Sequence, residues 1–130
     1  MKFYKCNKCG NIIILLEDSG VIPVCCGETM NELKCLTKDE LKEKHVPVVE
    51  CKDKEVHVKV GSVPHPMEKE HYIQWILVET NRGKYVRYLN PTEKPEACFK
   101  LCDDEVLVAV YEYCNIHNLW GKLNEQEDYC

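Results

Sequence analysis

The sequence has no long hydrophobic run. Apolar stretches such as residues 12–16 are far shorter than the roughly 20 residues that a helix needs to cross a membrane. The first residues also lack the extended apolar stretch and small-residue cleavage site that are typical of a secretory signal. We therefore expect no membrane partner and a cytoplasmic location.

A surplus of basic residues is also lacking. The chain has 17 Lys and Arg against 22 Asp and Glu, which gives a net charge of −5. Because nucleic-acid binding depends on positive charge that neutralises phosphates, this balance does not favour a nucleic-acid partner. It also means that an anionic substrate needs a local positive group to attract it.

Cysteine is what the sequence has in excess, with 10 in 130 residues. A secreted disulfide scaffold is one explanation, since the count is even and high. Four of the cysteines, however, fall in paired spacing near the start of the chain: Cys6, Cys9, Cys25 and Cys26. In a reducing cytoplasm such pairing indicates metal ligation, and a segment with little core of its own needs a metal to fold. We therefore assign residues 1–36 to a small metal-binding module.

The spacing of the four cysteines leaves the metal open. Four thiolates suit zinc or iron in a tetrahedral site. Side chains of adjacent residues normally diverge, so ligation by both Cys25 and Cys26 predicts a distorted tetrahedron. Gly10 is expected in the left-handed conformation, in a turn between short strands at residues 3–6 and 12–16. A structural zinc with no redox role remains the alternative to iron.

From residue 45 onward the pattern is that of β-strands. Strands are predicted at residues 46–50, 56–60, 72–80, 84–89, 97–101 and 105–113. Turn residues at 81–83 and at Asp103-Asp104 predict hairpins between the strands on either side. Short strands in this number favour an antiparallel β-sandwich over residues 45–130, so the fold class is all-β. Residues 37–44 form a linker with a capping-box pattern for one or two helical turns.

A second set of metal-binding side chains is scattered over this part of the chain. The set consists of His45, His65, His71, Cys114 and His117. Imidazoles and a thiolate suit iron, copper or zinc. Five protein ligands on an octahedral ion would leave one position open for a small substrate. His57 differs from the other histidines, because it alternates with valines in a strand and is expected to face solvent.

The two sets together resemble desulfoferrodoxin, the two-iron class of superoxide reductase. The resemblance rests on Cys6-x-x-Cys9 with Cys25-Cys26, and on Glu43-Lys44-His45, His65-Pro-Met-x-x-x-His71 and Cys114-Asn-x-His117. It implies a desulforedoxin-like (rubredoxin-like) module followed by an immunoglobulin-like β-sandwich. It also implies two irons, one held by the four cysteines and one by four equatorial histidines and the axial Cys114.

The resemblance implies an activity, the one-electron reduction of superoxide to hydrogen peroxide without formation of dioxygen, as a defence against oxidative stress. The axial thiolate of Cys114 would increase electron donation by the iron. Lys44 is expected to attract the anion and to order a proton-donating water. Glu43 resembles the family carboxylate that occupies the sixth position of the oxidised iron. An ordinary solvated lysine and a surface carboxylate are the alternatives for these two residues.

Partners are implied by the resemblance as well. A rubredoxin-type protein would re-reduce the iron, and family members are usually homodimers. Whether the four-cysteine site relays electrons stays open. A non-enzymatic zinc or electron-transfer protein and a dismutase are the competing functions.

Five further cysteines belong to no motif, and those in strands are expected to be buried thiols. They are Cys35, Cys51, Cys98, Cys102 and Cys130.

Overall fold

A computed structural model describes residues 1–38 and 44–124. The chain divides into two compact units, Met1–Lys34 and Cys35–Cys130, which we call the small unit and the large unit. The described residues of both contain strands and no helix, so the all-β prediction is confirmed. Among these residues there is accordingly no helix that is long and apolar enough to span a membrane. The helical turns predicted within residues 37–44 fall mostly on residues 39–43, which lie outside the described part of the chain.

The small unit contains two sheets with very little core. Its strands are β1 (Phe3–Lys5), β2 (Ile12–Ile14), β3 (Val24–Cys25), β4 (Glu28–Thr29) and β5 (Asn31–Glu32). The sheet order is β2-β1-β5, with β3-β4 as a separate hairpin. Tyr4, Cys6 and Met30 are the buried centre of the unit. Such a small apolar cluster does not stabilise a domain of this size by itself, which agrees with a fold that depends on bound metal.

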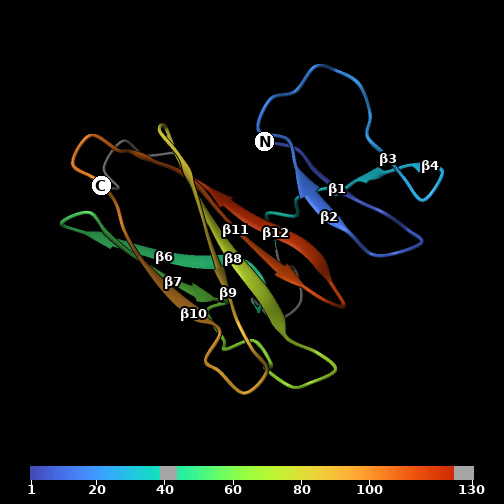
Figure 1. The fold of residues 1–130 in the computed structure, drawn as a ribbon. Coiled ribbons are helices and arrows are strands. Elements are labelled where there is room, and N and C mark those ends of the chain that lie inside the picture. Colours follow the sequence, from blue (N-terminus) through green and yellow to red (C-terminus); the bar gives the residue numbers. More distant parts are fainter. Residues whose placement is uncertain (39–43, 125–130) are drawn as a thin grey trace. The chain divides into compact units, whose positions relative to one another are not determined.

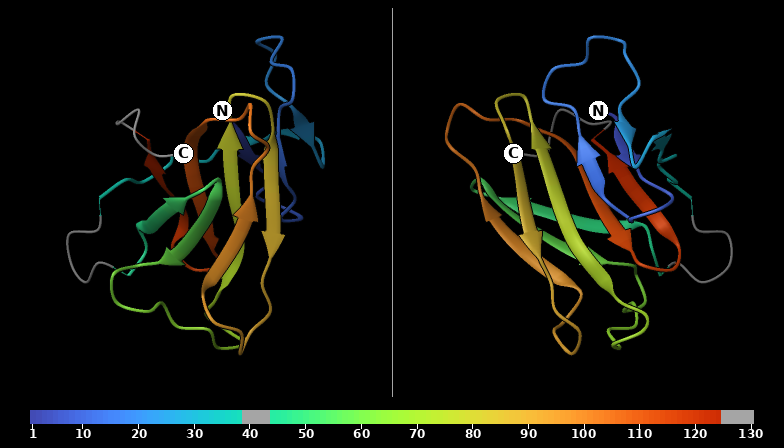
Figure 2. Two further views of the ribbon diagram at one scale, coloured as in Figure 1. Left: turned by 90° about the vertical axis from the view of Figure 1, so that its left-hand side faces the viewer. Right: turned by 45° about the vertical axis from the view of Figure 1, so that its right-hand side comes forward.

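The large unit is an antiparallel β-sandwich, as predicted. Its strands are β6 (Pro47–Lys52), β7 (Glu55–Val60), β8 (Ile73–Thr80), β9 (Lys84–Tyr88), β10 (Glu96–Lys100), β11 (Leu107–Cys114) and β12 (Asn118–Leu123). One sheet has the order β10-β7-β6 and the other the order β12-β11-β8-β9. Figure 1 labels both layers, and Figure 2 shows them from two further sides.

The core of the large unit lies between these two sheets because their strands alternate inward and outward residues. In β7, Val56, Val58 and Val60 are fully buried, whereas His57 between them is exposed, as the sequence predicts. From the other sheet, residues of β8 and β11 such as Ile76 join the same buried cluster. The sandwich is therefore a rigid frame whose ends carry the loops.

One predicted hairpin is correct and the other is wrong. Residues 81–83 join β8 to β9, which pair with each other. The turn at Asp103-Asp104 does not make a hairpin, because β10 pairs with β7 whereas β11 pairs with β8 and β12. The chain crosses there from one sheet to the other. Polar turn residues show where a chain bends, but the pairing partner depends on which core face the next strand covers. Strand β12 was not predicted from the sequence.

The cysteines outside the two motifs are mostly not buried thiols. Cys98 lies in β10 but is exposed, so the expectation of burial is wrong there, and Cys102 is exposed as well. Cys35 is a half-buried free thiol. Cys51 in β6 is half-buried against the core and is disulfide-bonded. Cys130 lies outside the described residues.

Candidate metal centres

The four cysteines of the small unit come together at one point. Cys6 follows β1, Cys9 lies in the next turn, Cys25 ends β3 and Cys26 starts the β3–β4 turn. Their sulfur atoms all lie within 4.8 Å of one another. The Sγ atoms of Cys9 and Cys25 are 3.6 Å apart, and those of Cys25 and Cys26 are 3.9 Å apart. The structure thus brings together all four cysteines that the sequence predicted to bind one ion.

Backbone conformation explains how the adjacent cysteines converge. Cys26 has a φ of 53° and Gly27 a φ of 76°, both in the left-handed region. A left-handed residue reverses the normal divergence of neighbouring side chains, at an energetic cost for a residue other than glycine. Gly10 has a φ of 82°, as predicted for the first turn. The backbone at Cys26 is therefore strained. Binding of one metal ion by both Cys25 and Cys26 would offset the energetic cost.

The protonation of this group is unusual for free thiols. The backbone N–H of Cys9 donates to Cys6 Sγ over 3.5 Å and lowers the pKa of Cys6 to about 6. The thiols of Cys6 and Cys9 raise the pKa of Cys25 to about 12, because neighbouring sulfurs cannot all carry negative charge. A divalent cation at their centre removes this repulsion, so the donor set fits a tetrahedral metal ion.

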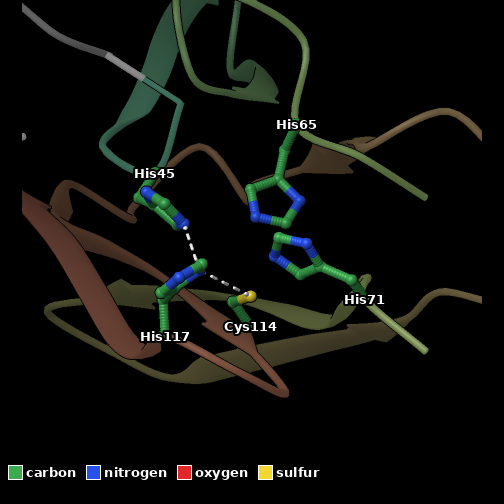
Figure 3. A group of neighbouring side chains, drawn as sticks. All are labelled: His45, His65, His71, Cys114 and His117. Carbon is green, nitrogen blue, oxygen red and sulfur yellow. Dashed lines mark hydrogen bonds between the residues drawn. The ribbon is translucent and has the colours of Figure 1, made fainter. Parts of the chain in front are cut away.

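Five donors gather in the same way at one end of the large unit (Figure 3). His45 immediately precedes the start of the first sheet, and His65 and His71 lie in the loop between β7 and β8. Cys114 ends β11, and His117 lies in the turn that leads to β12. One ligand atom from each lies within 4.8 Å of those from the others. Three segments that are far apart in the sequence therefore converge on one point at the edge of the sandwich.

The inward atoms of this cluster are identified by their contacts. His45 Nε2 lies 3.0 Å from His117 Nδ1, which in turn lies 3.8 Å from Cys114 Sγ. The ring of His65 lies edge-on to those of His45 and His71, with centroids 4.8 Å apart in each pair. His117 thus presents Nδ1 to the cluster, whereas His45 presents Nε2.

Two buried nitrogen atoms show that the cluster suits a metal ion. The Nε2 atoms of His65 and His71 are buried and make no hydrogen bond among the described residues. The Nδ1–H of His65 donates to the carbonyl of Pro66 over 2.7 Å, which leaves Nε2 as the atom with the lone pair. Burial lowers the pKa of His65 to about 4 and also lowers the pKa of His71. Both rings are therefore neutral near pH 7, which is the form that binds metals.

Cys114 lies at the buried side of the cluster. It follows an irregularity in the β8–β11 register between Tyr113 and Cys114, and such irregularities redirect side chains. Burial raises the pKa of Cys114, and the backbone N–H groups of His117 and Ile116 oppose that effect. A buried thiolate needs a nearby positive charge, and a cation bound to the neighbouring histidines provides one.

Asn115 connects two parts of the cluster. Its amide nitrogen donates to the carbonyl of Glu70 over 2.8 Å, and its amide oxygen accepts from the N–H of Tyr72 over 2.9 Å. These two partners flank His71. Asn115 therefore fastens the loop that carries His71 to the turn that carries Cys114 and His117.

Lys44 and Glu43 were predicted to act beside the open position of the second metal. Lys44 is half-buried, and its charge contributes to the lowered pKa of His71, whose main cause is burial. Gly61 has a φ of 80°, and a Cβ there would come within 2.6 Å of the Lys44 backbone. Gly61 thus permits the close packing that places Lys44 beside the cluster. Glu43 lies outside the described residues.

Sequence reasoning missed three residues that support the five donors, namely Gly61, Asn115 and Trp120. Trp120 stacks on His45 and donates to the carbonyl of His117. The signal for it is its position three residues after His117, in the same run as Cys114 and Asn115. Asn115 lay within a motif, but its spacing gave no sign of which loop it would hold.

Profiles of known families match both parts of the chain. The profile described as Desulfoferrodoxin matches residues 37–123, and the one described as Desulfoferrodoxin, N-terminal domain, matches residues 1–33. A desulfoferrodoxin of Syntrophotalea carbinolica is 49% identical and covers 93% of this chain and 94% of that protein. A desulfoferrodoxin of Nitratidesulfovibrio vulgaris is 45% identical, with 92% and 93% covered.

Solved structures agree with these matches. The superoxide reductase from Treponema pallidum superposes with a TM-score of 0.81 at 34% identity, covering 93% of this chain and 96% of that one. A superoxide reductase (1Fe-SOR) from Giardia intestinalis superposes with a TM-score of 0.55 at 30% identity. That alignment covers 65% of this chain and 100% of the Giardia chain.

Proposed function

The chain belongs to the desulfoferrodoxin family, and from this premise we propose that it is a superoxide reductase whose reaction takes place at the five-donor cluster of the large unit. Superoxide accepts one electron and two protons there and leaves as hydrogen peroxide. The observation that carries the proposal is the convergence of four histidines and one cysteine on a single point, with two buried Nε2 atoms that have no partner among the described residues. That donor set is unusual for a purely structural site.

We assign the ligands of two iron ions on the same basis. Cys6, Cys9, Cys25 and Cys26 would hold one, and His45, His65, His71, Cys114 and His117 would hold the other. Ferrous iron held by the second group would supply the electron for superoxide reduction. Zinc in the four-cysteine group remains the alternative metal there, because four thiolates suit both ions.

Lys44 provides the positive charge that an anionic substrate needs. The chain has a net charge of −5, so attraction of superoxide depends on a local field. The charge of Lys44 adds, after burial, to the lowering of the pKa of His71, which supports this role. An ammonium group at this position raises the encounter rate and holds a water that donates a proton to the reduced substrate.

Cys114 determines which direction of electron transfer is favoured. Cys114 lies buried at the end of β11, so the charge of its thiolate, once a cation is bound to the histidines, would be poorly screened. Negative charge beside the metal favours transfer of an electron from the metal to superoxide. It disfavours transfer of an electron from superoxide to the metal. The cluster is therefore suited to reduction and poorly suited to the oxidising half of a dismutase reaction.

Glu43 remains a proposal that rests on the resemblance to the family. Its place next to Lys44 in the sequence supports a role as a carboxylate ligand of the oxidised iron, which would close the site after the product has left. Substitution by alanine is expected to remove carboxylate ligation from the spectrum of the oxidised protein.

The remaining assignments concern partners and location. Each turnover oxidises the iron, so an external one-electron donor is required, and a rubredoxin-type protein is the donor we propose. We propose a homodimer on the family resemblance alone. We propose a cytoplasmic location, because cysteines that bind a metal must stay reduced.

The products of the reaction test the proposal. A reductase forms one hydrogen peroxide for each superoxide consumed and no dioxygen, whereas a dismutase forms one peroxide and one dioxygen from two superoxides. We expect the first ratio when the pre-reduced chain is mixed with a limiting amount of superoxide in anaerobic buffer. Release of dioxygen in the second ratio would identify a dismutase, and no reaction above the spontaneous rate would support the structural zinc protein.

A further inference from the structure

Trp120 touches two of the five residues in the cluster, although it offers no metal ligand itself. Its ring stacks on that of His45, with centroids 4.7 Å apart and an interplanar angle of 18°. Its Nε1–H donates a hydrogen bond to the backbone carbonyl of His117 over 2.9 Å. We propose that Trp120 is a positioning residue that holds His45 and His117 together for iron binding. This inference rests on the proposed function, since it takes the cluster to be the iron site.

Neither of the two histidines that Trp120 contacts is fully buried. His65 is buried, and its Nδ1 is fixed by Pro66. His71 lies between the two backbone groups that Asn115 holds. His45 is half-buried and precedes β6, and His117 is exposed in a turn. A metal site needs each donor fixed to within a fraction of an ångström, so this pair requires a brace from outside the donor set.

The two contacts act on different degrees of freedom. Stacking of the indole on the imidazole restricts rotation of the His45 side chain. The hydrogen bond to the His117 carbonyl fixes the backbone from which that ring projects. Because His45 Nε2 and His117 Nδ1 lie 3.0 Å apart, one residue thus sets the orientation of both inward nitrogens. Each contact acts on a different histidine, so Trp120 needs both to orient the pair.

Trp120 is itself held on a rigid element. Its strand, β12, pairs with β11, where Glu112 lies opposite Trp120. Leu36 forms a bridge to Trp120 on the other side, with hydrogen bonds between Leu36 and the residues that flank Trp120. A Cβ at Gly121 would come within 2.6 Å of Cys35 Sγ, so the absence of a side chain there allows this close approach. The indole is therefore anchored from both edges of the strand.

Iron release from the full-length, iron-loaded chain tests the proposal. The variants are Trp120→Leu, which removes both contacts, and Trp120→Phe, which keeps a stacking ring but loses the N–H donor. Trp75→Phe is the matched control, because Trp75 lies in β8 of the same sheet and stacks on Tyr113. Release of iron to a ferrous chelator is followed by Mössbauer spectroscopy, which distinguishes tetrathiolate iron from histidine-ligated iron.

We expect Trp120→Leu to release iron from the histidine-rich centre about tenfold faster, in line with the usual cost of removing a group that orients metal ligands. Trp120→Phe should lie between this variant and the wild type. The control should match the wild type, and the tetrathiolate iron should be unaffected in every chain. The same rate in Trp120→Leu as in the wild type would overturn the proposal, as would equally accelerated loss from both centres.

Two further comparisons keep the outcome decisive. Should Trp120→Leu fail to fold, Trp120→Phe replaces it: faster release from the histidine-rich centre supports the proposal, and wild-type release overturns it. His65→Ala separates this inference from the proposed function. If His65→Ala retains its histidine-ligated iron, the site assignment itself fails. If that variant loses the iron while both Trp120 variants keep theirs, only the role of Trp120 fails.

Discussion

At the scale of single residues, the arrangement of the donors depends on neighbours that are not donors. The carbonyl of Pro66 fixes the tautomer of His65, and the amide of Asn115 fixes the backbone around His71. The motifs in the sequence were enough to predict which residues gather. They could not predict which ring nitrogen faces inward, because that depends on local backbone contacts. Motif spacing indicates donor type, whereas donor geometry comes from the surrounding fold.

The role of Lys44 leads to a kinetic prediction. Replacing Lys44 by Ile should slow the second-order reaction with superoxide by about tenfold, because the local attraction for the anion is lost. The dependence of the rate on ionic strength should flatten as well, since less charge remains to be screened. Pulse radiolysis of the pre-reduced chain measures both. Lys59→Ile, on the exposed side of β7, is the control and should react as the wild type does.

Asn115 gives a second prediction at this scale. Asn115→Ala removes both hydrogen bonds that flank His71, so the loop should move and affinity for ferrous iron at the five-donor centre should fall about tenfold or more. Chelator competition measures the affinity. Asn90→Ala, on the loop after β9, removes the hydrogen bond that the Asn90 side-chain amide donates to Glu93 and should not change the affinity. If Asn115→Ala binds ferrous iron as tightly as Asn90→Ala does, Asn115 does not hold the loop that carries His71 in place.

At the scale of elements, the sequence predicted strands better than their pairing. Alternating valines identify β7 because one face of that strand is fully buried. The crossover after β10 was mistaken for a hairpin because its turn has the same polar residues that a hairpin has. Tertiary packing decides the path of the chain after β10. Leu107 is the first residue of β11 and belongs to the same buried core as Val110. Contacts between strands far apart in sequence leave no local trace.

Glu105 fixes this crossover and predicts a dependence of stability on pH. Its carboxylate accepts hydrogen bonds from Tyr85 over 2.6 Å, Thr80 over 2.8 Å and the N–H of Cys102 over 2.8 Å. These bonds, that from Tyr85 first, hold the pKa of Glu105 below its ordinary value of 4.5. Because the folded-state pKa is the lower one, the stabilisation is complete above pH 4.5 and is lost as the pH falls through the folded-state pKa.

Glu105→Gln should therefore be less stable than the wild type at pH 7, and the difference should shrink as the pH falls below 4.5. Thermal unfolding of the iron-loaded chain between pH 3 and pH 7 measures this. Glu96→Gln, exposed in β10, is the matched control and should follow the wild type at every pH. A stability difference that stays constant across this range would exclude the ionised carboxylate as its source.

At the scale of the whole molecule, the chain consists of two compact units with one metal group each. The small unit has only a small buried cluster, made of Tyr4, Cys6 and Met30, so we expect metal binding and folding to be coupled there. The large unit has its own extensive core and carries all five donors of the proposed catalytic site. The Giardia superoxide reductase (1Fe-SOR) aligns over its full length with 65% of this chain.

Removing the first metal group should therefore leave the chemistry intact. Cys9→Ala should lose the tetrathiolate iron and unfold the small unit, because three thiolates bind the ion much less tightly. The second-order rate with superoxide, measured after chemical reduction, should stay within about twofold of the wild type if the large unit acts alone. A much lower rate would show that the tetrathiolate iron takes part in the fast step.

The most direct test of the central claim follows superoxide decay by pulse radiolysis in the reduced wild type and in His65→Ala. His65 is buried, and its inward nitrogen has no partner among the described residues, so its loss removes a donor without disturbing a hydrogen bond of that nitrogen. The account predicts rapid decay proportional to protein concentration, with no dioxygen formed, in the wild type. It predicts loss of this reaction in His65→Ala, which should still hold the tetrathiolate iron. Decay at the wild-type rate in His65→Ala would contradict the claim.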